Sequence, residues 1–167
     1  MTGTVGPRGT RDLQQISKVT LSEIVGLLKA ANEMGGQAEV AKISQQFDMA
    51  LDRLPAILSA AQFLGLASVA EGEVTVTDLG RRVVAANLRQ RKVIVREVIR
   101  ELPLFQKVTD MIRRSGRPLA RQELLSLLVE SFGSHQADGV FNALVYWGRY
   151  AELLSYDSRV EQLSLRP

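Results

Sequence analysis

Apolar residues in the first part of the chain recur every three or four positions, the spacing of a helix that buries one face. The first helix is predicted to begin after Thr20, because Glu23 lies three residues further on and completes a capping box. A short second helix is predicted over residues 37–48 and a third over residues 51–65. Pro55 is compatible with the third helix because it lies near the helix start.

The pattern then changes to alternating apolar and polar residues over residues 66–76. Glu71 and Gly72 interrupt the alternation at its centre, which is typical of the tight turn of a β-hairpin. Thr77 follows as the predicted N-cap of a further helix. Helices followed by a hairpin are the element order of a winged helix-turn-helix, in which the hairpin forms the wing.

The second half of the chain repeats this order. Helices are predicted between Pro103 and Gly148, and a second hairpin turns at Asp157. The predicted fold class is therefore mainly α with short β-hairpins, as tandem winged helix-turn-helix units joined by linking helices. The predicted parts are a flexible tail or linker at residues 1–18, a first winged-helix unit at 19–86, a linking helix at 87–102 and a second winged-helix unit at 103–167.

The only Trp and all three Tyr of the chain lie within residues 146–156. They fall where the last helix meets the second hairpin. Large side chains at this position usually pack the hairpin against the helices. We therefore interpret Trp147 and Gly148 as structural anchors. The alternative is contact with a partner, because aromatic residues and Arg are enriched at binding hot spots. The residues that would make this contact are Tyr146, Arg149 and Tyr150.

The net charge of +3 is unevenly distributed along the chain. Residues 81–117 hold 11 of the 21 Lys and Arg residues and three acidic residues, which gives this segment a net charge of +8. The segment is either a solvated helix face or a docking surface for an acidic partner, nucleic acid or an anionic membrane. As a docking surface it would act through Arg89, Arg91, Arg96 and Arg100.

The composition excludes several kinds of site. The chain has no Cys, which rules out disulfides, thiolate metal ligands and Cys nucleophiles, and His135 is its single His. We therefore expect no enzyme activity, no catalytic residues, no cofactor and no metal site. No apolar run approaches the roughly 18 residues of a spanning helix, and the N-terminus lacks a signal-peptide pattern. The sequence thus predicts a cytoplasmic protein without membrane insertion.

Four stretches together resemble the C-terminal AAA-associated domain. They are "LSEIVGLLKAANEMGGQAEVAKISQQF", "LGLASVAEGEVTVTDLGRR", "RQRKVIVREVIRELPL" and, most specifically, "NALVYWGRYAELLSYD", and the resemblance covers roughly residues 20–165. It implies a mostly helical accessory or regulatory domain beside the ATP-binding subunit of nitrate/sulfonate/taurine-type ABC transporters. That subunit would be the partner in cis or in trans, and it would bring the domain to the inner face of the membrane.

The chain itself carries no GxxxxGK[ST] phosphate loop, so ATP hydrolysis by the chain is not expected. The sequence leaves open whether the chain stands alone or is cut from a longer ATPase. It also leaves open whether the chain forms a homodimer.

A winged-helix DNA-binding transcriptional regulator is the alternative function. Such a protein places cations on its recognition helix and wing. Here the candidate recognition helices offer Arg53, Gln62 and Asn142, while Glu71 and Glu73 on the first wing would repel phosphate. The sequence therefore favours a non-catalytic interaction domain that works with an ABC-type ATPase, and nucleic acid is the less favoured partner.

Overall fold

The computed structural model describes residues 16, 19–46 and 52–167. The chain divides into two compact units. We call residues 18–91 the N-terminal unit, and residues 92–167 together with Ile16 the C-terminal unit. Of the predicted tail at residues 1–18, only Ile16 belongs to the described residues. The boundary between the two units falls within a helix. Each unit is described below by itself.

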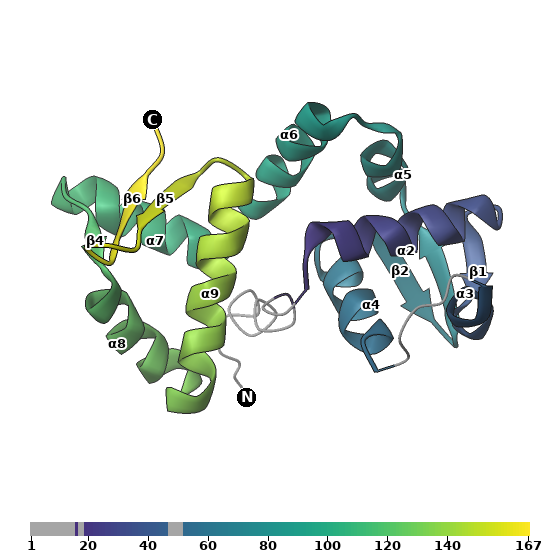
Figure 1. The fold of residues 1–167 in the computed structure, drawn as a ribbon, viewed down its shortest axis with the longest axis horizontal. Helices are drawn as coiled ribbons and strands as arrows, with labels where there is room; N and C mark the ends of the chain where they lie inside the picture. The colour runs from purple at the N-terminus through teal and green to yellow at the C-terminus, as the bar shows by residue number, and fades with distance from the viewer. Residues whose placement is uncertain (1–15, 17–18, 47–51) are drawn as a thin grey trace. The chain divides into compact units, whose positions relative to one another are not determined.

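The N-terminal unit contains helices and one small sheet (Figure 1). Its elements are α2 (Leu21–Glu33), β1 (Gln37–Glu39), α3 (Val40–Gln46), α4 (Leu54–Phe63), β2 (Ala67–Ala70), β3 (Glu73–Val76) and α5 (Asp78–Ala85). The predicted capping box starts α2, because the Thr20 side chain accepts from the backbone N–H of Glu23. Helix α2 packs against α4, α5 and β3, so its apolar face forms the centre of this core.

The sheet of the N-terminal unit has the antiparallel strand order β1-β3-β2. Strands β2 and β3 form the predicted hairpin, and both turn residues have positive φ, 52° at Glu71 and 78° at Gly72. Positive φ at both central residues is the conformation of a type I′ turn, one of the two common two-residue hairpin turns. The sequence prediction of one helix over residues 37–48 is wrong at its start, because Gln37–Glu39 pair with β3 as strand β1. Residues 47 and 48 lie outside the described residues.

Helix α6 (Leu88–Ile99) leads to the C-terminal unit, whose elements repeat the same order. They are α7 (Pro103–Ser115), β4 (Leu119–Ala120), α8 (Arg121–Phe132), α9 (Ser134–Tyr150), β5 (Leu154–Asp157) and β6 (Gln162–Leu165). The antiparallel strand order β4-β6-β5 matches that of the first sheet. The prediction of a mainly helical fold with short hairpins, repeated in tandem, is confirmed. Strand β4, like β1, was not predicted.

The core of the C-terminal unit gathers around α9. Trp147, Phe105 and Leu124 are among its largest fully buried side chains, and Ile16 is buried with them. Helix α9 continues two residues beyond Gly148, where the sequence predicted its end. In the described ranges, no helix combines the length and the apolar character needed to cross a membrane.

Candidate functional site

Three cations of the C-terminal unit follow one another at a spacing of four residues. Lys92 and Arg96 lie on α6, and Arg100 directly follows it, with its backbone N–H bonded to the Arg96 carbonyl at 3.0 Å. Residues four apart share one face of a helix, so like charges at this spacing repel each other. Helix α6 also has no acidic residue in its first turn, where the helix dipole favours anions. At the other end of the helix the dipole favours Arg96, which lies in the last turn of α6. The dipole does not favour Lys92, and it does not offset the repulsion between like charges along the row.

The basic row begins beside the aromatic corner of the chain. The Lys92 ammonium lies 5.7 Å from the centre of the Tyr150 ring, a cation–π contact. The Tyr146 ring is 39% exposed and packs edge-on against Trp147, with 5.2 Å between ring centres. Arg149 is exposed on the same last turn of α9. The structure thus brings two features together that the sequence showed separately, the basic segment and the Tyr-rich stretch.

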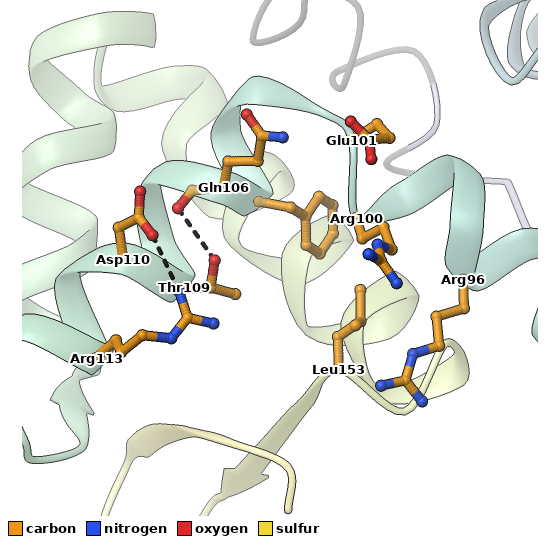
Figure 2. Close-up of a pocket in the computed structure, with 9 residues that line it drawn as sticks. Arg96, Arg100, Glu101, Gln106, Thr109, Asp110, Arg113 and Leu153 are labelled. Atoms are coloured by element: carbon orange, nitrogen blue, oxygen red, sulfur yellow. Dashed lines mark hydrogen bonds and ion pairs between the residues drawn. The ribbon is translucent and has the colours of Figure 1, made fainter.

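The other end of the basic row opens on a pocket of about 500 Å³. Figure 2 shows Arg96 and Arg100 on one side of it and Thr109, Asp110 and Arg113 of α7 on the other. Its apolar part comes from a buried Phe and a half-buried Leu. The full lining is Arg96, Arg100, Glu101, Phe105, Gln106, Thr109, Asp110, Arg113 and Leu153.

The cations of the pocket differ in how far they are already paired. Arg113 donates to the Asp110 carboxylate at 3.1 Å, and Arg100 reaches Glu97 at 3.4 Å. For the Arg96 guanidinium, no hydrogen bond or ion pair is found within residues 19–46 and 52–167. Arg96 is therefore the lining cation best placed to accept a new carboxylate, and Arg100 is only weakly held.

Two of the four arginines predicted for docking lie elsewhere. Arg89 is exposed within the N-terminal unit. Arg91 is half-buried, and it donates from Nε to the Val83 carbonyl at 3.0 Å and from Nη2 to the Ala86 carbonyl at 3.2 Å. These carbonyls end α5, so Arg91 caps that helix. Its guanidinium has a structural use, in contrast to that of Arg96.

Trp147 and Gly148, which the sequence analysis interprets as structural anchors, are both buried. Trp147 is 0% exposed, and its indole Nε1 donates to the Ile16 carbonyl at 3.0 Å. A Cβ atom added to Gly148 would lie 2.7 Å from Cδ1 of Leu154. Since a methyl group has no room there, α9 can approach β5 this closely only with Gly at that position.

The cation predicted for DNA recognition is engaged within the protein. Arg53 donates to the Glu23 carboxylate from Nε at 2.9 Å and from Nη2 at 2.6 Å, a forked ion pair between the start of α4 and α2. Burial alone would raise the pKa of Glu23, but Arg53 and the Thr20 backbone N–H together hold that pKa below its usual value. At the turn between β2 and β3, Glu71 and Glu73 are exposed and line a hollow of about 600 Å³. The surface predicted for DNA recognition in this unit is therefore poorly suited to phosphate.

Sequence reasoning did not place Thr109, Asp110, Arg113 or Leu153 in a site. Arg113 belongs to the basic segment, but its position opposite Arg96 depends on how α7 turns back after α6. Leu153 reaches the pocket from the turn between α9 and β5. No local pattern in the sequence signals either approach.

The sequence matches the model of the C-terminal AAA-associated domain family over residues 41–157. The chain belongs to this family. The match includes every residue that lines the basic pocket. The family's name associates its members with AAA ATPases, so an ATPase is the class of partner that membership supports. No curated protein and no solved structure matches the chain.

Proposed function

We propose that this member of the C-terminal AAA-associated domain family is a non-catalytic accessory domain that binds and regulates an ABC-type transporter ATPase, in cis or in trans. The observation that carries the proposal is the basic pocket of the C-terminal unit. It presents a guanidinium, that of Arg96, which pairs with nothing in the described residues. A domain associated with an ATPase needs a surface to recognise it, and this pocket is the best candidate.

The lining of the pocket supports binding rather than catalysis. Among its nine residues, Thr109 carries the only hydroxyl, and that hydroxyl donates to the Gln106 carbonyl at 3.0 Å instead of to a base. A nucleophile without a positioned base is weak. The absence of a phosphate loop from the sequence supports the same view, since it leaves no recognisable element for holding ATP.

The test uses the purified chain and the ATP-binding subunit of a nitrate/sulfonate/taurine-type transporter from the same organism. Binding is measured by biolayer interferometry, and Mg-ATP hydrolysis is measured for the subunit with and without the chain. We expect saturable binding, a changed rate of hydrolysis by the subunit and no hydrolysis by the chain alone. Where domain and ATPase form one polypeptide, the comparison is between that polypeptide and its version without the domain.

Two results would contradict the proposal. One is the absence of both binding and any effect on the ATPase. The other is tight, sequence-selective DNA binding that is lost on mutating Gln62 or Asn142, which would identify a transcriptional regulator instead. Nonspecific DNA contact through the basic segment alone would give only a weak, strongly salt-dependent Kd of roughly 10⁻⁴–10⁻⁶ M.

A further inference from the structure

We infer that the basic pocket binds carboxylate side chains from an Asp- or Glu-containing segment of the ATPase, with Arg96 and Arg100 as the residues that hold them. This inference rests on the proposed function and names the chemistry of its contact. In this inference the two walls of the pocket have different roles. The α6 wall binds the partner, and the α7 wall is held by the internal ion pair of Arg113 with Asp110.

The geometry of the cations supports a carboxylate as the ligand. A guanidinium presents two parallel N–H donors that match the two oxygens of a carboxylate. Arg96 has this fork available, and the Arg100–Glu97 contact, at 3.4 Å between exposed side chains, is weak enough to exchange for another carboxylate. Arg113 is held by Asp110 on its own helix, so it shapes the far wall.

The charge balance of the pocket separates a protein segment from a polyanion. Three Arg face Glu101 and Asp110 within one lining, so the formal charge of the pocket is only +1. The two acidic residues would repel the closely spaced phosphates of a DNA backbone or the headgroups of an anionic bilayer. One or two carboxylates placed on the α6 side avoid Asp110, which lies on α7 and pairs with Arg113, so that Glu101 is the one acidic lining residue near them.

The composition of the lining argues against a small free ligand. Sites for small molecules enclose their ligand and are lined mainly by apolar residues. Seven of the nine lining residues here are polar or charged, and six of these seven, all but Thr109, are exposed. Such an exposed pocket is suited to a side chain of a bound protein, because contacts elsewhere on that protein can position the side chain. Leu153 and Phe105 supply a limited apolar floor for the stem of that side chain.

The experiment compares two double variants of equal charge change. Arg96→Glu/Arg100→Glu reverses the proposed binding residues. Lys107→Glu/Arg114→Glu reverses two exposed cations of α7 that do not line the pocket, and it serves as the control. Circular dichroism and thermal unfolding establish that both variants are folded. The Kd for the purified ATP-binding subunit is then measured for each variant at low and at physiological salt.

We expect the pocket variant to bind the subunit at least about tenfold more weakly than wild type, the loss expected for two partly exposed ion pairs. The control variant should stay close to wild type. Arg96→Lys, which keeps the charge but loses the fork, should give an intermediate Kd. An oligoglutamate peptide should compete with the subunit for the wild-type chain, and an oligoglutamine peptide should not. Salt should weaken wild type more than the pocket variant.

The outcomes separate the inference from the proposed function. Equal weakening in both double variants, or in neither, while wild type binds the subunit, overturns the inference and leaves the function standing. Failure of wild type to bind or regulate the subunit overturns the function and the inference with it. Pocket-dependent binding of inorganic phosphate, a free dicarboxylate, a random DNA duplex or anionic vesicles that is tighter than binding of the subunit also overturns the inference.

Discussion

Replacing Trp147 should destabilise the C-terminal unit in two separable steps. The indole is fully buried, and its Nε1–H bonds to the carbonyl of Ile16, which is itself buried. Trp147→Phe keeps most of the apolar bulk but leaves that carbonyl without its donor. An unsatisfied buried acceptor costs about 1–3 kcal/mol. Trp147→Ala removes the ring as well, and losing a core aromatic costs about 3–5 kcal/mol.

The measurement is thermal and urea unfolding followed by far-ultraviolet circular dichroism. For a unit of this size, each kcal/mol shifts Tm by about 4–8 °C, so the two variants should be clearly resolved. Since Trp147 is the single Trp of the chain, fluorescence of the wild-type protein reports on this unit alone, and its emission should shift to longer wavelength on unfolding.

The order of the effects tests the reasoning. Wild type should be the most stable, then Trp147→Phe, then Trp147→Ala. An unchanged unfolding midpoint in Trp147→Ala would refute the role of Trp147 as a core anchor and return the aromatic stretch to the class of binding surfaces. A Phe variant as stable as wild type would show that the bond to Ile16 contributes nothing.

Two further substitutions have effects that the structure determines. Gly148→Ala should lower the free energy of unfolding by about 1–3 kcal/mol through overpacking, because the new methyl group would lie 2.7 Å from Leu154. In a double-mutant cycle, Leu154→Ala should then destabilise the Gly148→Ala variant less than it destabilises wild type. The Arg117 guanidinium, with the backbone N–H at the start of α8, lowers the pKa of Glu123 to about 2. Because the folded-state pKa is lowered, the contribution of Glu123 to stability is complete above its unfolded pKa of about 4.3 and is lost as pH falls through about 2. The difference in unfolding midpoint between wild type and Glu123→Gln should therefore shrink across that pH window. A difference that is independent of pH would contradict this assignment.

The sequence by itself determined the features that depend on neighbouring residues. The capping box of Thr20 and Glu23 and the tight turn at Glu71 and Gly72 are interactions between residues at most three positions apart. Apolar spacing likewise determined which helix faces are buried, because each face is fixed by the period of the helix. The mainly helical class and the tandem order of the elements follow from these local patterns.

Only the tertiary structure decided which distant segments meet. Strands β1 and β4 are too short to have a pattern of their own, and they exist because β3 and β6 offer them backbone partners. Ile16 looks like part of a polar tail until the indole of Trp147, 131 residues away, binds its carbonyl. The pocket has the same origin: the sequence shows that Arg96 and Arg113 are cations, but only the path of the chain from α6 into α7 sets them on opposite walls. There Arg113 pairs with Asp110, and Arg96 has no ion pair within the described residues.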